Sequence, residues 1–217
     1  MKIIFDFDGT IHKSDEIYEK AFYNTLKKYK IKKPNLNVKS YLGYPPRKIW
    51  DDFLDDSYDK EKLIETTGNL MIENMKDFGS LYDETKKVLD ILKNKHKLII
   101  LSSCSRKYID NARKIYNLDS YFEKYLVGED YNYKSKAEII KINKIDNFVI
   151  VGDRLSDIKA GFLNNNISIF AKYGYGEEKE GELADIKIEK ISDLLKIKAL
   201  SWFSKPLFLH FHIILNC

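Results

Sequence analysis

Two aspartates, Asp6 and Asp8, stand two residues apart directly after the apolar run 3–5. Branched and aromatic residues in such a run are typical of a buried strand, and Gly9 predicts a turn at its end. Side chains two residues apart on a strand leave the same face, so the two carboxylates are expected close together. Two neighbouring negative charges repel unless a cation or a shared proton offsets them. The pair therefore predicts a metal site or an acid–base pair, with a simple turn rich in Asp and Gly as the alternative.

Hydroxyl groups follow a second apolar run, 97–101, where Ser102 and Ser103 precede a helical pattern. At the end of a strand and the start of a helix, such hydroxyls can bind a phosphate oxygen. They can also do no more than cap the helix, and both interpretations stay open. Cys104, beside them, is expected to be a packing residue, because no histidine or metal ligand stands near it in the sequence.

A second pair of acidic residues follows the apolar run 147–151. Gly152 lets the backbone approach other groups closely, and Asp153 comes directly after it. Asp157 lies four residues further on, in the first turn of a predicted helix, where the helix dipole favours a negative charge. This simple role accounts for Asp157 but not for Asp153, which we therefore expect in a functional site.

Lys136 begins another helical pattern, 136–144. A positive charge at the start of a helix is unfavourable and a nearby anion would offset it, although most lysines are simply solvated surface residues. Carboxylates, a hydroxyl, a lysine and further carboxylates thus fall at the ends of neighbouring strands or in connecting loops. That order predicts phosphoryl transfer, with metal ligands, a nucleophile, an oxygen donor and a cation.

The elements that must place these residues alternate along the chain. Strands are predicted at 2–6, 97–102, 124–127, 147–152 and 166–171. Helices are predicted between them, for example at 82–94, 105–116, 136–144 and 154–163. Such alternation with apolar strands predicts an α/β fold, a doubly wound and mostly parallel sheet with a Rossmann-like core and helices on both faces. The carboxyl ends of the strands then share one edge, where ligands bind in open α/β sheets.

Residues 14–80 interrupt the alternation, because they contain helical periodicity but no convincing strand. We interpret them as a helical cap inserted into an α/β core made of residues 1–13 and 81–200, lying over the strand end that carries Asp6. The sequence Gly-Tyr-Pro-Pro at 43–46 is expected to break this insertion internally. The alternative is that these helices merely extend the main fold.

The composition limits the class of protein. Hydrophobic residues make up 44% of the 217 and charged residues 32%, enough to fill a core and to solvate its surface. The net charge is +4, but 37 basic residues are interleaved with 33 acidic ones, which argues against a nucleic-acid groove. The two cysteines, Cys104 and Cys217, make no disulfide framework, so a reducing, cytoplasmic location is expected. No run reaches the roughly 18 apolar residues of a membrane span, and no signal peptide is expected.

The C-terminal segment 201–217 is apolar, with Lys205 as its single charge. It can pack on the body, form an oligomer contact, touch a membrane surface or represent an aberrant end of the reading frame. A metal site at His210 and His212 is not expected, because no further ligands accompany them. The role of this tail and the oligomeric state are left open.

These motifs, in this order, resemble those of the haloacid dehalogenase superfamily over residues 1–198 or so. The segment DFDGT at 6–10 matches the first motif of that superfamily, and GDRLSD at 152–157 matches the fourth. Ser102 matches the second motif and Lys136 the third, with Lys134 as a competing choice for the lysine. LGYPPR at 42–47 and YGYG at 173–176 resemble the phosphoglycolate-phosphatase-like branch, which carries a helical cap.

The resemblance implies roles for the matching residues. Mg²⁺ would be the cofactor, held by the carboxylates of Asp6 and Asp153 and by the backbone carbonyl of Asp8. Asp6 would be the nucleophile that forms an aspartyl-phosphate. Asp8 would protonate the leaving oxygen and then help to activate water. Ser102 and Lys136 would hold the phosphoryl oxygens.

Other positions have supporting roles in the same interpretation. Asp157 would help to position a water on the metal, or Lys136, and Thr10 and Gly152 complete the first and fourth motifs. Arg47 is the candidate for a contact between cap and substrate, with an ordinary surface arginine as the alternative. Ser103 is a further candidate for a substrate contact. The chain departs from the family at two positions: the family often has Asn where Ser103 stands and Asp where Lys13 stands. The departure at Lys13 concerns substrate preference rather than the chemistry.

The resemblance thus predicts a Mg²⁺-dependent phosphatase acting on a small phosphorylated metabolite. A phosphomutase of the β-phosphoglucomutase type stays open because it keeps every core residue, and a non-catalytic binding protein on the same fold is a lesser alternative. A dehalogenase is not expected, because it would lack the carboxylate of Asp8. Phosphoglycolate, nucleotides, pyrophosphate and sugar phosphates all remain open as substrates.

Overall fold

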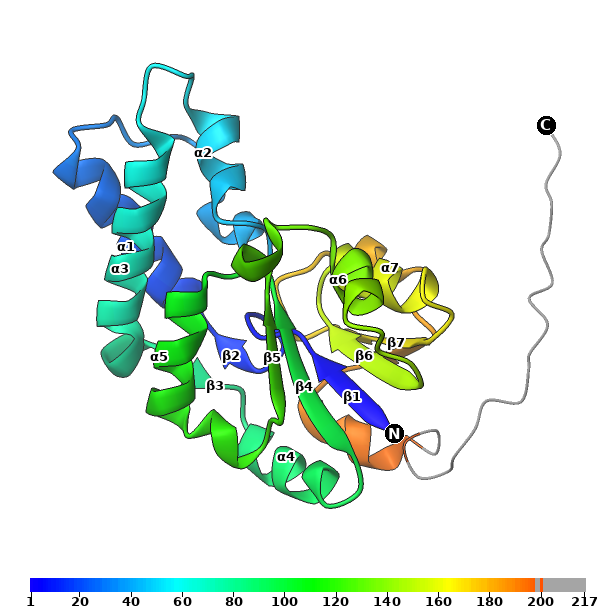
Figure 1. Ribbon diagram of the computed structural model, residues 1–217. Coiled ribbons are helices and arrows are strands. Elements are labelled where there is room, and N and C mark those ends of the chain that lie inside the picture. The colour runs from blue at the N-terminus through cyan, green and yellow to red at the C-terminus, as the bar shows by residue number, and fades with distance from the viewer. Residues whose placement is uncertain (198–199, 201–217) are drawn as a thin grey trace, which may run out of the picture.

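The computed structural model describes residues 1–197 and 200, and a six-stranded parallel sheet lies at its centre (Figure 1). Its strands are β1 (Lys2–Phe5), β4 (Lys97–Ser102), β5 (Lys124–Val127), β6 (Phe148–Gly152), β7 (Ile167–Ala171) and β8 (Ile186–Ile188). They lie in the order β5-β4-β1-β6-β7-β8, so the N-terminal strand is central. This confirms the predicted doubly wound α/β fold.

Apolar side chains give the sheet two buried faces. In β1, Ile3 and Phe5 belong to one core cluster, whereas Ile4 belongs to the other. The same alternation continues in β4 and β6, the strands that flank β1. Continuously apolar strands of this kind are stable only where both faces are covered.

Helices cover the two faces. The cluster on one face includes side chains of α4 (Thr85–Lys93), α5 (Arg106–Tyr116), η2 (Leu118–Ser120) and η5 (Ile191–Lys196). The cluster on the other includes side chains of α6 (Lys136–Ile142) and α7 (Leu155–Phe162). The short 3₁₀ turns η3 (Gly128–Tyr131) and η4 (Glu178–Gly181) follow β5 and β7.

A separate helical group, blue to cyan in Figure 1, lies between β1 and β4 in the chain. It consists of α1 (Asp15–Lys28), η1 (Val38–Tyr41), α2 (Arg47–Phe53) and α3 (Lys60–Phe78). These helices have a cluster of their own, in which the rings of Phe22 and Trp50 lie 4.9 Å apart. Ile17 and Met75 belong to the sheet cluster instead, so the group also packs on the main core. The predicted break at 43–46 is present, because Pro46 directly precedes α2.

A two-residue ribbon joins this group to the sheet. It consists of β2 (His12–Lys13), which pairs antiparallel with β3 (Ser80–Leu81). The sequence did not predict β2, β3 or β8, because two or three residues are too few to show a period. The helix predicted at 82–94 begins only at Thr85, because Glu84 has a left-handed φ of 63° that ends the preceding turn.

The apolar tail 201–217 lies outside the described residues, so its alternatives stay predictions. Among the residues that are described, no helix is both long enough and apolar enough to cross a membrane.

Candidate active site

The polar strand ends meet at one edge of the sheet. β1 lies between β4 and β6, and Asp6, Ser102 and Asp153 stand at the carboxyl ends of these three strands. The backbone N–H of Asp6 donates to the carbonyl oxygen of Val151 at 2.9 Å, so the first and fourth motifs are in direct contact. In open α/β sheets this edge, where the connections change direction, is the usual place for a ligand.

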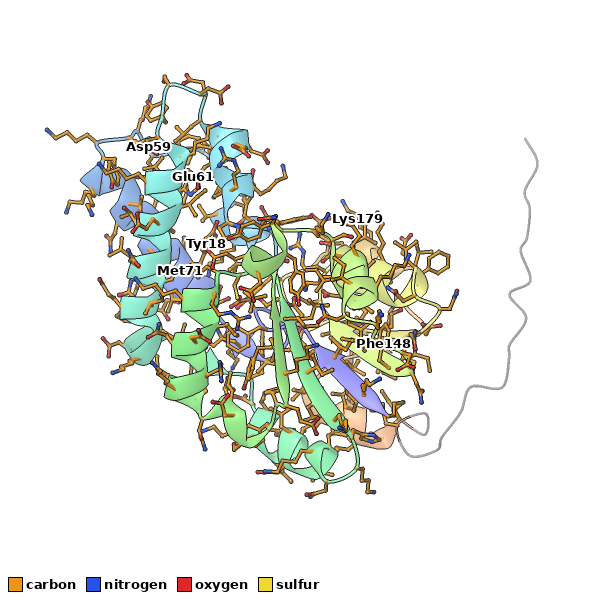
Figure 2. The ribbon with its side chains drawn as sticks, viewed as in Figure 1. Tyr18, Asp59, Glu61, Met71, Phe148 and Lys179 are labelled. Atoms are coloured by element: carbon orange, nitrogen blue, oxygen red, sulfur yellow. The ribbon has the colours of Figure 1, made fainter. Side chains whose placement is uncertain are left out.

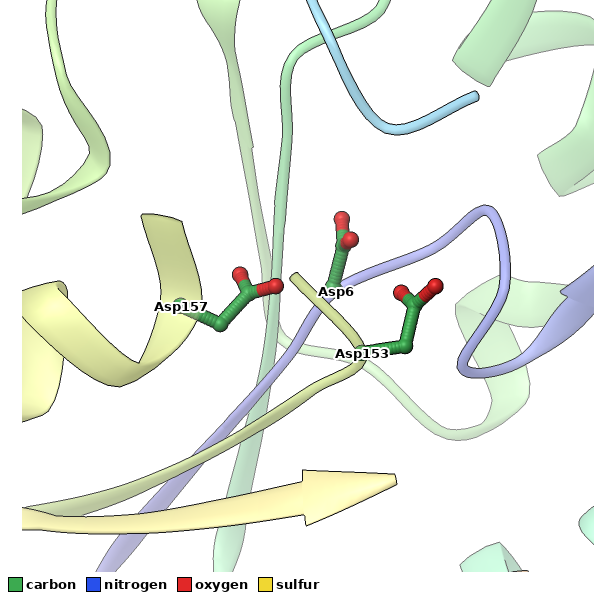
Figure 3. A group of neighbouring side chains, drawn as sticks. All are labelled: Asp6, Asp153 and Asp157. Carbon is green, nitrogen blue, oxygen red and sulfur yellow. The ribbon is translucent and has the colours of Figure 1, made fainter. Parts of the chain in front are cut away.

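Three carboxylates form a buried group at this edge (Figure 3). One oxygen each of Asp6, Asp153 and Asp157 lies within 4.8 Å of the others, and the side chains are almost fully enclosed. Asp6 follows β1, Asp153 follows β6, and Asp157 comes from the first turn of α7. The Oδ2 atom of Asp6 is buried and has no hydrogen-bond partner in the described part of the chain. A buried acceptor without a donor is costly, which favours a cation at this point.

The pKa values of these carboxyls are raised from their ordinary value of 3.8. Burial, with the charge of Asp153 adding to it, raises the pKa of Asp6 to about 6. Burial and the charge of Asp157 raise the pKa of Asp153 to about 7, and burial also raises the pKa of Asp157 to about 7. Three carboxylates against one lysine leave an excess of negative charge. Such a set of oxygen donors fits a hard divalent cation such as Mg²⁺.

Lys136 is the lysine that reaches this group. Its Nζ lies 2.8 Å from Asp6 Oδ1 and 2.6 Å from Asp157 Oδ1, and the side chain is buried. Burial alone would lower the pKa of Lys136, but the charges of Asp157 and Asp6 outweigh it and raise the pKa. Lys134, the competing choice, is exposed.

Two glycines allow the carboxylates to approach the backbone. Gly9 has a φ of +85°, and a Cβ there would lie 2.3 Å from Asp153 Oδ2. A Cβ on Gly152 would lie 2.1 Å from the carboxyl carbon of Asp157. Neither contact is sterically allowed, so both positions require glycine while the carboxylates stay in place.

Asp153 is held from two sides. The hydroxyl of Thr10 donates to its Oδ1 at 3.3 Å. On the other side, the backbone N–H groups of Tyr175 and Gly176 donate to its Oδ2 at 2.7 and 3.3 Å. The YGYG segment and Thr10 therefore both hold the carboxylate of Asp153 by hydrogen bonds.

A cavity of about 380 Å³ opens from this edge toward the helical group. Asp6, Asp8, Ser102 and Ser103 line it from the sheet, and Arg47 lines it from α2. The Ser102 hydroxyl is buried and accepts from the backbone N–H of Cys104 at 3.3 Å, so it caps the turn and borders the cavity at once.

Cys104 also lines the cavity, next to these hydroxyls. Burial, with the charge of Asp8 adding to it, raises the pKa of its thiol well above the ordinary range. A thiol kept protonated is a poor nucleophile, in line with the packing role expected for this cysteine.

Residues 3–172 match the protein family described as haloacid dehalogenase-like hydrolase. The chain belongs to this family. The matched region contains all four motifs, so the resemblance drawn from the motifs is confirmed. Pyrophosphatase PpaX from Anoxybacillus flavithermus is 27% identical to this haloacid dehalogenase-like hydrolase in an alignment 212 residues long, which covers 90% of this chain and 95% of that protein.

Solved structures agree with the fold. A haloacid dehalogenase-like family hydrolase from Streptococcus pneumoniae superposes with a TM-score of 0.79 at 17% identity, covering 90% of this chain and 96% of its own. CbbY from Rhodobacter sphaeroides in complex with phosphate superposes with a TM-score of 0.78 at 14% identity, covering 89% of this chain and 95% of its own. At such identities the likeness shows a shared architecture.

The structure of this haloacid dehalogenase-like hydrolase adds residues that sequence reasoning missed. The hydroxyl of Tyr108 donates to Asp8 Oδ1 at 3.0 Å, and His12 Nδ1 lies 3.2 Å from the same oxygen. His12 is fully buried, and its Nε2 lies 2.8 Å from the hydroxyl of Tyr116. The one available signal was His12 itself, an isolated histidine between the first motif and Ser14.

Proposed function

We propose that this protein is a Mg²⁺-dependent phosphatase that hydrolyses a small phosphorylated metabolite through an aspartyl-phosphate on Asp6. The observation that carries the proposal is the position of Asp6, beside Lys136 and the carboxylates of Asp153 and Asp157 at one end of the cavity. A nucleophile next to a cation and to metal-binding oxygens suits the transfer of a phosphoryl group. The name of the pyrophosphatase relative supports a phosphorylated substrate.

The donor set supports a bound magnesium ion. The carboxylates of Asp6 and Asp153 and the backbone carbonyl of Asp8 would hold it, and Asp157 would support Lys136 or a water on the ion. Once bound, the ion supplies positive charge that stabilises the phosphoryl oxygens during transfer.

The chain's own residues would then act in two steps. A carboxylate oxygen of Asp6 attacks phosphorus, the bond to the leaving oxygen breaks, and protonated Asp8 gives its proton to that oxygen. Water next attacks the phosphorus of the aspartyl-phosphate, and Asp8 takes a proton from the water. The bond between phosphorus and the Asp6 oxygen breaks, which releases phosphate and regenerates the Asp6 carboxylate. The hydroxyl of Ser102 and the ammonium of Lys136 bind the phosphoryl oxygens throughout.

We also propose that residues 14–80 act as a cap over a core made of 1–13 and 81–200. The cavity supports this division, because side chains of the helical group line one side of it and the strand-end loops the other. A cap that closes over the substrate excludes bulk water and orients the ester. Arg47 and Ser103 are the proposed substrate contacts, although Arg47 also pairs with Asp51 and Glu61.

The decisive experiment replaces the proposed nucleophile. Asp6→Asn should lower Mg²⁺-dependent hydrolysis of p-nitrophenyl phosphate by about 10³-fold or more, because no covalent intermediate can form. Phosphate release is measured with and without Mg²⁺, and circular dichroism checks the fold. Asp90→Asn, at an exposed position of α4, is the matched control and should keep full turnover.

Unchanged turnover in Asp6→Asn would rule out the assigned nucleophile. A parallel assay for isomer formation from hexose phosphates separates a phosphatase from a phosphomutase, because only the latter returns the phosphoryl group to the sugar.

A further inference from the structure

The cavity that ends at Asp6 has room for more than a phosphoryl group. Its volume of about 380 Å³ lies in the range, roughly 300–1,000 Å³, of pockets that enclose a whole small-molecule ligand. The walls of the remaining space therefore decide which group can accompany the phosphate.

The walls that the helices supply are mainly apolar. Tyr18 from α1 and Trp50 from α2 face the cavity together with Ile64, Met71 and Ile72 from α3. Figure 2 labels Tyr18 and Met71 on their helices. An apolar group bound against these side chains is removed from water, which is favourable in proportion to its area. Tyr18, which is only partly buried, adds an aromatic side chain to this wall.

The charged residues around this space carry an excess of negative charge. Apart from the two motif aspartates, the acidic side chains that line it in the described residues are Glu61, Glu65 and Glu129. The basic side chains that line it there are Arg47 and Lys107.

Both of these cations already have partners. Arg47 forms an ion pair with Glu61, and its Nε lies 3.4 Å from Asp51 Oδ2. The Nζ of Lys107 donates to Asn69 Oδ1 at 2.6 Å. A second anionic group on the substrate would have to displace Glu61 and Asp51 from Arg47 or bind at Lys107, which keeps two further N–H donors. In either place it would also face Glu65 and Glu129, which disfavours it.

We infer, on the basis of the phosphatase function proposed above, that the substrate is a phosphomonoester of an uncharged alcohol with an apolar or aromatic part. Substrates with a second phosphate or a carboxylate bind poorly in this cavity. The preference therefore differs from the one that the name of the pyrophosphatase relative indicates.

Binding of matched ligands tests the preference directly. Calorimetry on Asp6→Asn with Mg²⁺ compares benzyl phosphate, ethyl phosphate, 2-phosphoglycolate and pyrophosphate. Benzyl and ethyl phosphate are both esters of primary alcohols and differ by the ring, and 2-phosphoglycolate differs from ethyl phosphate by its carboxylate. We expect benzyl phosphate to bind about tenfold or more tightly than ethyl phosphate, and 2-phosphoglycolate more weakly than either.

Variants of the walls connect the preference to the residues named. Ile64→Thr should weaken the binding of benzyl phosphate without changing the binding of ethyl phosphate. Met71→Gln repeats this test at a second position. Glu65→Lys should raise the affinity for 2-phosphoglycolate by about threefold to tenfold. Glu73→Lys, on the same helix but away from the cavity lining, is the matched control. It should change the affinity for neither benzyl phosphate nor 2-phosphoglycolate.

Tighter binding of 2-phosphoglycolate or pyrophosphate than of benzyl phosphate overturns the inference, as do equal effects of Ile64→Thr and Met71→Gln on every ligand. The kcat/KM values of the unaltered protein for the same four compounds provide a second measurement of the order. Absence of Mg²⁺-dependent turnover on all of them counts against the phosphatase function instead, because the order of binding needs no turnover.

Discussion

The carboxylate of Asp8 is fixed by two neighbouring side chains, Tyr108 and His12, which both contact its Oδ1 atom. Burial, followed by the charge of Asp8, raises the pKa of Tyr108 well above its usual value, so the hydroxyl stays a hydrogen-bond donor. His12 Nδ1 lies 3.2 Å from Asp8 Oδ1, so the ring donates to this oxygen in the tautomer that carries its hydrogen on Nδ1. The His12 ring is fixed in turn by stacking on Phe7, with centroids 4.9 Å apart. In the mechanism proposed above, Tyr108 and His12 would position Asp8 for proton transfer.

Tyr108→Phe removes one of these donors while keeping the ring. We expect kcat/KM for ethyl phosphate to fall about tenfold, because its alkoxide leaving group needs a proton from Asp8. The value for p-nitrophenyl phosphate should change much less, because p-nitrophenolate leaves without protonation. Steady-state kinetics on the two substrates measure the difference, with Tyr121→Phe as the control. Equal losses on both substrates would assign Tyr108 a purely structural role.

Much of the carboxylate site was predictable from the ends of the strands. Asp6, Ser102 and Asp153 follow apolar runs, and parallel strands bring such ends to a single edge, so their meeting was predictable. The role of Tyr108 was not predictable, because its bond to Asp8 depends on how α5 packs on the sheet. Hydrogen bonds between elements distant in the chain leave no spacing in the sequence.

Among the elements, α6 is the one that places the lysine of the carboxylate group. Lys136 is its first residue, and Ser135 caps it in a capping box with Glu138. The cap fixes where the helix begins, and the carboxylates of Asp6 and Asp157 offset the positive charge at its N-terminus.

Ser135→Ala should therefore affect both stability and turnover. Loss of an N-cap costs about 1 kcal/mol, and the first turn that carries Lys136 then frays. Asp59→Ala, which removes the N-cap of α3, is the matched control. We expect thermal melting to show similar destabilisation in both variants, and phosphate release to fall only in Ser135→Ala. Full turnover in Ser135→Ala, despite a lowered melting temperature, would contradict this role for the cap.

Long apolar elements were predicted well and short ones were not. The strand predicted at 97–102 is observed with the same limits, because six residues beside a helix give a clear pattern. The helix predicted at 136–144 ends at Ile142, because the backbone at Lys144 turns left-handed with a φ of 51°. Element ends depend on such local geometry, which periodicity does not report.

For the whole molecule, the buried carboxylates make stability depend on pH. The pKa values of Asp6, Asp153 and Asp157 are raised in the folded protein to about 6, 7 and 7. Between the ordinary carboxyl pKa and these values, the folded state binds more protons than the unfolded state. Stability without metal is therefore greatest on the acidic side of this window and falls as the pH rises through it.

Melting temperatures in EDTA should fall by at least about 3 °C between about pH 5 and about pH 8. Mg²⁺ should raise the melting temperature, and more so at the higher pH, because it binds the ionised carboxylates. Asp157→Asn should flatten the pH dependence by removing one titrating group. A melting temperature in EDTA that rises across this pH window would contradict the expected linkage.

The ribbon of β2 and β3 has a consequence for how such molecules diversify. Lys13 and Ser80 face each other across one strand spacing, about 4.8 Å, so the chain departs and returns at practically the same point. Another segment whose ends lie equally close could therefore replace the residues between Lys13 and Ser80, and the connections between the sheet strands would stay as they are. Such a segment would need apolar side chains at the positions of Ile17 and Met75, which pack on the sheet. Recombination at this junction would exchange the helices proposed to contact the substrate and leave the carboxylates and the lysine at the sheet edge in place.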